Sequence, residues 1–158
     1  MLYSLFEWLE ASPLGAFMKD LPATFAIVEA VHLMGLALLG GAVLAADLRL
    51  LNVLLRDVPS NVVTSQAHRW FKIALWILVC TGVPMLAGVA TKCYHNPFYW
   101  TKMIALAIGI LFVFTLKQPL LRSDHSAVRP MTLKLMALAS MSVWFLVAAS
   151  GRWIGFSG

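Results

Sequence analysis

The stretch PATFAIVEAVHLMGLALLGGAVLAADLRLL, residues 22–51, decides the fold of this chain. Between Pro22 and Asp47 it carries two ionisable side chains, Glu29 and His32, in an otherwise apolar run. The run exceeds the roughly 20 residues that a helix needs to cross the hydrocarbon core of a bilayer. Ionisable groups at membrane depth are costly, and they mark either function or a specific internal pairing. The stretch therefore predicts a membrane-spanning helix in which Glu29 and His32 are the first residues to explain.

The whole chain has the composition of a membrane protein. Hydrophobic residues make up 61% and charged residues 12% of its 158 residues, and this charged share is about half that of a soluble domain. Four stretches approach or reach spanning length: 23–46, 70–90, 98–116 and 135–154. We therefore predict an all-α, four-helix integral membrane bundle that occupies residues 1–158 as a single domain.

The positive charges are divided unequally between the two ends of the predicted spans. A net charge of +5 is compatible with nucleic-acid binding, but the basic residues gather in no single patch. Seven lie in or beside the first and third loops and four toward the other end: Arg49, Arg56, Arg69, Lys117, Arg122, Arg129 and Lys134 against Lys19, Lys92, Lys102 and Arg152. This bias predicts that the first and third loops are cytoplasmic. Both termini then face the periplasm of a bacterial inner membrane, and we expect no nucleic-acid partner.

The first 20 residues carry a pattern of their own. Leu5, Phe6 and Leu9 recur at helical spacing, and Trp8 suits the headgroup level of a bilayer. The acidic start does not fit a signal peptide, which needs basic residues there. We expect a short amphipathic interfacial helix over residues 1–20, and the alternative is a frayed apolar tail.

The first two spans are expected to form a long antiparallel hairpin. Helical apolar spacing continues through DLRLLNVLL until Asp57, and the second helix starts near Ser60. With a turn near residue 58, positions whose numbers sum to about 117 share a depth, because a short loop makes the two helices antiparallel neighbours. This register sets His32 near Met85.

The same register sets Asp47 near Arg69 at the inner rim. A buried carboxylate needs a compensating charge or hydrogen bond. We therefore predict a structural contact from Asp47 to Arg69, Lys72 or His68.

Small residues form a stripe along the first span. Ala37, Gly41 and Ala45 lie four residues apart on one helix face. Such residues let a second helix approach closely in lipid. The stripe predicts a packing seam, whose partner is either the fourth span or another subunit.

Haem is the leading cofactor hypothesis, because four-helix membrane bundles hold b-type haem between side chains on facing helices. His32 lies at membrane depth, roughly 13 Å below the outer end of its span. The other histidines lie nearer the surfaces: His95 in the outer loop, and His68 and His125 at the inner rim. His32 can serve as a ligand with Met85, alone in a five-coordinate site, or with a histidine of another subunit. His68 with His125 is a second, shallow candidate pair.

The structural alternative for these polar groups is internal pairing. Arg152, near the outer end of the fourth span, stands close to the expected level of Glu29, and a Glu29–Arg152 ion pair would offset a large burial cost. His32 would then be a buried neutral imidazole that is hydrogen-bonded within the bundle.

Other metal chemistry fits less well. Glu29 and His32 have the Glu-x-x-His spacing of di-iron bundles, but such bundles need two of these motifs and two further glutamates. The eight methionines could ligate copper, although methionine is also ordinary apolar filler. Cys80 and Cys93 are expected to be free thiols, because about 20 Å of helix would separate them.

Segments along nearly the whole chain resemble a bacterial family of small four-span membrane proteins catalogued as a domain of unknown function. The segments are LFEWLEAS (5–12), IVEAVHLMGLALLGGAVLAADLRLL (27–51), Thr81 with Gly82, NPFYWTKM (96–103) and SMSVWFLVAASGR (140–152). The resemblance implies an Asn and a His toward the inner half of the third span, where this chain has Ile110 and Thr115. The resemblance implies no reaction.

More distantly, the run from His32 to Gly41 is similar to the first helix of copper-resistance-type membrane domains and of haem-binding membrane protoporphyrinogen oxidases. The latter also place a lysine in a later span, much as Lys102 is placed. This similarity favours haem or redox chemistry at His32.

Together these patterns predict a cytochrome-b-like membrane protein that carries electrons or serves a redox partner, without independent catalytic activity. The alternative is a non-catalytic membrane subunit that stabilises a larger complex. Both imply contact with the lipid bilayer and with other membrane subunits or further copies of the chain. A proton or small-molecule transporter is a third interpretation, but the broken half-helices typical of transporters are not evident.

Overall fold

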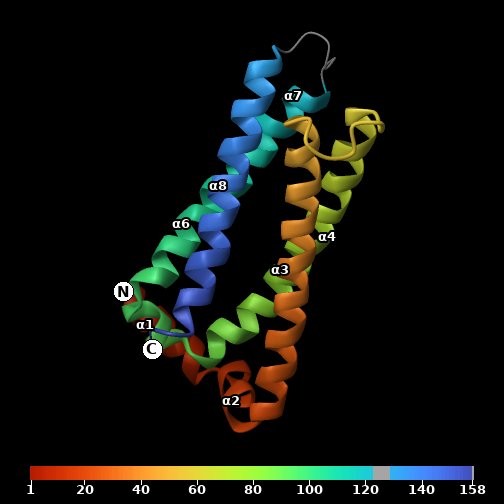
Figure 1. Ribbon diagram of the computed structural model, residues 1–158. Helices are drawn as coiled ribbons and strands as arrows, with labels where there is room; N and C mark the ends of the chain where they lie inside the picture. Colours follow the sequence, from red (N-terminus) through yellow and green to blue (C-terminus); the bar gives the residue numbers. More distant parts are fainter. Residues whose placement is uncertain (123–128, 158) are drawn as a thin grey trace.

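The computed structural model of the protein describes residues 1–122 and 129–157 and is all-α there (Figure 1). The elements in chain order are α1 (Leu2–Ala11), α2 (Pro13–Asp20), α3 (Pro22–Leu50), α4 (Ser60–Gly88), α5 (Ala90–His95), α6 (Pro97–Leu111), the π-helical segment η1 (Phe112–Lys117), α7 (Gln118–Arg122) and α8 (Pro130–Ile154). The predicted fold class is confirmed: the protein is all-α, and four long apolar helices follow short helical structure at the N-terminus.

Four helical stretches are long and apolar enough to cross a membrane. They are Pro22–Leu50, Ser60–Gly88, Pro97–Leu120 and Pro130–Ile154, with 29, 29, 24 and 25 residues. Each exceeds the roughly 20 residues that a span requires. The chain is therefore a multi-pass membrane protein. The bounds are wider than the expected stretches because the helices continue past the hydrocarbon-length apolar core of each span.

The four long helices are arranged as two antiparallel hairpins. Helix α3 packs along α4, α6 packs along α8, and contacts between α3 and α8 join the hairpins (Figure 1). Both termini lie at the same end of the bundle, as the even number of spans requires. The side of the membrane that this end faces remains a prediction from the charge bias.

The interior of the bundle is built from alanines, branched aliphatic residues and two aromatic residues. The main cluster consists of Leu39, Ala42, Val43, Phe71, Ala74, Ala105, Val113, Trp144 and Val147. Alanines at helix crossings let the backbones approach, which suits packing in lipid. Phe71 meets Trp144 edge-on, with 5.2 Å between ring centroids. This cluster draws on all four spans and fixes the hairpins against one another.

The first 20 residues form two helices, whereas a single helix was expected. The break is at Ser12, whose Oγ accepts a hydrogen bond from the backbone N of Gly15 at 3.2 Å and so caps α2. Pro13 occupies the first turn of α2, where its missing N–H costs nothing. Phe6 is buried against Tyr94 and Tyr99, so α1 is packed on the chain and is not a frayed tail.

An ionic contact holds these short helices to the end of the bundle. Glu10 accepts hydrogen bonds from Lys19 Nζ and from the backbone N of Thr91, each at 2.5 Å. Burial acts to raise the pKa of the Glu10 carboxyl, but the hydrogen bonds from Lys19 and Thr91 outweigh it and lower this pKa to about 2. One carboxylate thereby joins α1, α2 and α5.

The turn of the first hairpin differs from the expected one. Helix α3 ends at Leu50 instead of continuing toward Asp57, because Asn52 and Leu55 adopt left-handed backbone conformations with φ of 59° and 54°. Arg49 Nε donates to the carbonyl of Val58 at 2.8 Å and holds the loop closed. With this earlier end, the helices pair about one turn away from the expected register.

Candidate functional site

His32 lies half-buried on α3, where its ring faces α4. Its Nδ1 lies 2.8 Å from Thr81 Oγ1, and Thr81 Oγ1 in turn lies 2.6 Å from the carbonyl oxygen of Ile77. A threonine hydroxyl has one hydrogen to donate, and the Ile77 carbonyl can only accept. Because Thr81 Oγ1 donates to this carbonyl, we assign it as the acceptor of a hydrogen bond from Nδ1–H of His32. This fixes the imidazole tautomer and leaves the lone pair on Nε2, the atom that a metal or a hydrogen-bond donor could use.

Lys102 on α6 lies close enough to His32 to interact with it electrostatically. Its side chain runs along Gly151 of α8, where an added Cβ atom would lie 3.5 Å from Nζ. An added Cβ at Gly82 would likewise lie 3.4 Å from Cε1 of His32. All four spans thus contribute to one level of the bundle, where Gly82 and Gly151 lie beside the two polar side chains.

Lys102 has no counter-ion in the part of the chain that the structure describes. The ion pairs found there are Lys19–Glu10 and Lys117–Asp47, and Lys102 belongs to neither. A cation inside a spanning helix without a carboxylate partner is costly and is a functional-site candidate by default.

Met85, the expected mate of His32, lies on α4 one turn beyond the residues that His32 meets. The contacts of His32 are with Thr81 and Gly82, so equal depths correspond to residue numbers that sum to about 113 and not 117. The shift follows from the early end of α3 at Leu50. Met85 is half-buried, and no contact between it and His32 brings the expected axial pair together.

The expected ion pair of Glu29 with Arg152 does not form. Both residues are exposed, and the guanidinium of Arg152 instead lies over the ring of Phe156, 4.8 Å from its centroid. Glu29 occupies the outer face of α3, which turns away from the other spans. Equal depth was therefore insufficient for pairing, because the two side chains point out of the bundle from different helices.

At the opposite end of the bundle, Asp47 is fully buried. The Nζ atom of Lys117 lies 2.5 Å from Asp47 Oδ1 and 3.0 Å from Ser140 Oγ. Asp47 is thus paired across the bundle with η1, and not with Arg69, which is exposed on α4. The expected contact is corrected, because η1 turns the last residue of the π-helical segment toward the interior while the basic residues of α4 face outward.

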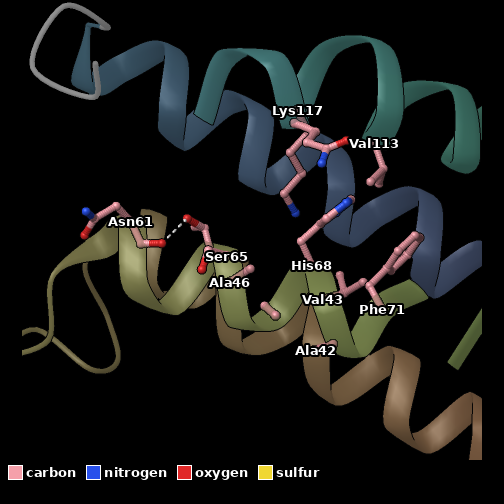
Figure 2. A pocket seen from close by; sticks show the side chains of 12 residues that line it. Ala42, Val43, Ala46, Asn61, Ser65, His68, Phe71, Val113 and Lys117 are labelled. Atoms are coloured by element: carbon pink, nitrogen blue, oxygen red, sulfur yellow. Dashed lines mark hydrogen bonds between the residues drawn. The ribbon is translucent and has the colours of Figure 1, made fainter. Parts of the chain in front are cut away.

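A cavity of about 240 Å³ lies beside this ion pair (Figure 2). Its lining comes from α3, α4, η1 and α7: Ala42, Val43, Ala46, Asn61, Thr64, Ser65, Ala67, His68, Phe71, Val113, Lys117 and Gln118. His68 is half-buried, stacks on Phe71 with 6.3 Å between ring centroids, and meets Phe114 edge-on. His125, its expected partner in a shallow haem site, lies outside the described residues.

Clusters of hard or nitrogen-rich metal ligands are absent from the part of the chain that the structure describes. No three His, Cys, Asp or Glu side chains there are close enough together to hold a metal ion. Cys80 is exposed on α4 and Cys93 is buried on α5, both as free thiols. Burial raises the pKa of the Cys93 thiol, so it is packed in its protonated form.

Two polar partners escaped the sequence reasoning. Thr81 stood out as part of a Thr-Gly pair without a role, and Lys117 counted as a loop charge just past the predicted third span. The available signal for Lys117 was its position at the end of an apolar run, level with Asp47 across the bundle. The Lys117 side chain points toward the interior because of η1, and no local sequence pattern predicted this π-helical segment.

Comparisons with known proteins identify a family and nothing more specific. The model of DUF6644, a family of unknown function, matches residues 5–157. No curated protein and no solved structure matches the chain.

Proposed function

The chain belongs to the DUF6644 family, and we propose that it is a b-type haem protein of the membrane in which His32 is the axial ligand that this chain supplies. The observation that carries the proposal is the 2.8 Å contact between His32 Nδ1 and Thr81 Oγ1. Because Nδ1–H donates to Thr81 Oγ1, the lone pair of Nε2 is available to iron.

The neighbouring residues suit the periphery of such a group. Haem carries propionate carboxylates, and Lys102 offers a cation that no described carboxylate neutralises. Gly82 and Gly151 carry no side chain that would crowd His32 and Lys102. The donor set thus fits one axial ligand and one propionate partner, and it does not fit a bis-histidine site within one chain.

A haem bound at this level would supply a one-electron redox centre within the membrane-spanning part of the bundle. The role of the chain is then to fix the imidazole through Thr81, to balance charge through Lys102, and to exclude water with the surrounding apolar spans. With His32 as the single ligand from this chain, any second ligand to the iron would have to come from a partner subunit. This arrangement suits an electron-transfer or redox accessory subunit.

The test is a reduced-minus-oxidised visible spectrum of the protein purified in mild detergent from cells supplied with a haem precursor. We expect a reduced b-type α-band together with roughly stoichiometric iron. His32→Ala should lose the band. His95→Ala is the matched control. His95 is the last residue of α5, is exposed, and contacts Tyr3 and Tyr94. A colourless, iron-free wild-type protein, or a band that persists in His32→Ala, contradicts the proposal.

A second candidate function is that of a non-catalytic subunit within a larger membrane complex. One observation favours it: an outward stripe on α3, formed at four-residue spacing by Glu29, Leu33, Ala37 and Gly41, is exposed throughout. Ala37 and Gly41 of the predicted seam thus face away from the fourth span, which leaves a helix of another subunit as their partner. A carboxylate on this face is also easier to place against a protein partner than against lipid.

Native electrophoresis after gentle extraction tests this candidate. Gly41→Phe should release the protein from its complex, since an aromatic ring would block close helix approach. Ala139→Phe, on the exposed face of α8, should leave the complex intact. Migration of the wild-type chain as a monomer would remove the support for this function, and the haem spectrum would be unaffected by that result.

A further inference from the structure

The cavity beside Lys117 has a polar floor and apolar walls. Lys117 extends from η1 toward His68 across the space between η1 and α4 (Figure 2). Val43, Phe71 and Val113 are buried and form an apolar wall, whereas Asn61 and Ser65 at the edge are exposed. A molecule could therefore enter with an apolar body and meet a hydrogen-bonding group inside.

Lys117 has hydrogen-bonding capacity to spare. An ammonium group carries three N–H donors, and within the described ranges 1–122 and 129–157 two of them are used, toward Asp47 Oδ1 and Ser140 Oγ. The Lys117 side chain is 8% exposed, so bulk water does not simply take up the third. Buried polar groups normally have hydrogen-bond partners. The third N–H of Lys117 is therefore available to a molecule bound in the cavity.

The charge balance selects the kind of ligand. Asp47 is fully buried and already neutralises Lys117, so the pair offers no net positive charge to an anion. Placing an additional phosphate or carboxylate beside Asp47 would add a like-charge repulsion in a poorly solvated site. A neutral acceptor such as a carbonyl oxygen would instead take the third N–H of Lys117 without any charge penalty.

The size and walls select the shape. The volume of about 240 Å³ is well above the share of about 30 Å³ that one water occupies and below the 300–1,000 Å³ of sites for drug-sized ligands. One substituted six-membered ring fits this range. Phe71, with His68 stacked on it, offers flat aromatic surface to such a ring.

We propose that this pocket binds the head ring of a membrane quinone, one carbonyl of which accepts a hydrogen bond from Lys117. The pocket lies at the loop end of the spans, between α3, α4 and η1, where a lipid-soluble molecule can keep its tail in the bilayer. The site lies at the opposite end of α3 from His32, and the proposal does not depend on haem at that residue.

The experiment is isothermal titration of the full chain in detergent micelles with decylubiquinone. Saturable binding is expected for the wild type. Ala67→Leu fills the cavity from α4 and should weaken binding at least about tenfold, whereas Ala139→Leu, the same change on an exposed face of α8, should have no effect. The thermal midpoint of each unliganded variant shows that it is folded.

Two further arms define the chemistry. The double variant Asp47→Leu with Lys117→Met removes the donor without leaving a buried charge unpaired, and it should also weaken binding about tenfold. Decyl phosphate, which has the same alkyl chain and an anionic head, should not compete with decylubiquinone. Equal quinone uptake by the wild type and Ala67→Leu would mean partition into micelles and would overturn the proposal. Effective competition by decyl phosphate would identify an anion site and would overturn it as well.

Discussion

Lys117 Nζ lies 2.5 Å from Asp47 Oδ1, and this contact joins η1 of the second hairpin to α3 of the first. Ser140 of α8 shares the same ammonium at 3.0 Å. Both members of the ion pair are buried, Asp47 completely. A polar connection among three spans is therefore built into the interior, and the two hairpins are held together by charge as well as by apolar packing.

Lys117→Met should destabilise the protein by about 3–5 kcal/mol, because it leaves the buried Asp47 carboxylate without its counter-ion. Adding Asp47→Leu to Lys117→Met should recover most of this loss. The measurement is thermal or denaturant unfolding in one detergent, arranged as a double-mutant cycle. Lys134→Met, at an exposed position of α8, is the matched control and should change stability by less than about 0.5 kcal/mol. A coupling energy near zero would contradict the structural role of the pair.

Thr81→Val should cost about 1–3 kcal/mol, because it leaves His32 Nδ1–H without its acceptor inside the bundle. Thr81→Ser keeps the hydroxyl and should retain the contact. The sharper measurement is the ¹⁵N NMR spectrum of labelled histidine, which distinguishes the two tautomers. We expect the Nδ1–H form in the wild type and in Thr81→Ser, and a changed population in Thr81→Val. A wild-type His32 protonated at Nε2 would contradict the hydrogen-bond assignment.

Two glycines of α3 should respond in opposite ways to alanine. At Gly35 an added Cβ would lie 2.9 Å from Ile77 Cγ2, so Gly35→Ala requires the Ile77 side chain to shift and should cost about 1–3 kcal/mol. At Gly41 nothing lies within 4 Å, so Gly41→Ala should be neutral or stabilising, by up to about 1 kcal/mol, through helix propensity. Unfolding midpoints of the two isolated variants make the comparison. Equal destabilisation by both would show that the outward face of α3 is packed even in the isolated chain.

Acid should loosen the N-terminal helices before it affects the spans. The pKa of Glu10 is lowered from 4.5 to about 2 in the folded protein, so its contribution to stability is fully present above about pH 4.5. That contribution is lost as the pH falls from about 4.5 through about 2. Hydrogen exchange of the Thr91 amide, which donates to Glu10, should accelerate over this window relative to the exchange expected from pH alone.

Glu10→Gln is the control for this pH dependence. It removes the titrating group but keeps an acceptor for Thr91, so protection of the amide should be weaker and should no longer vary over that window. A wild-type protein whose Thr91 protection is independent of pH between 5 and 2 would contradict the ionic role of Glu10.

The expected contacts differ from the observed ones mainly because the rotation of each helix about its axis, which sets where its side chains point, was not predicted. The register error of one turn between α3 and α4 arose in the loop, where Asn52 and Leu55 take left-handed conformations that apolar spacing does not reveal. Glu29 and Arg152 failed to pair because each faces outward. A sequence predicts the depth of a residue along a span to within about a turn. Which faces of two helices meet depends on all the contacts between them.

The sequence by itself determined the class of the protein: four apolar spans, termini at one end, and His32 at membrane depth. These features follow from the length of apolar runs and the thickness of a bilayer, which are local quantities. Only the tertiary structure decided that Asp47 meets Lys117, that Thr81 fixes the tautomer of His32, and that Glu29 faces out of the bundle. Each of these depends on helix rotation and register, which packing between segments distant in the chain sets.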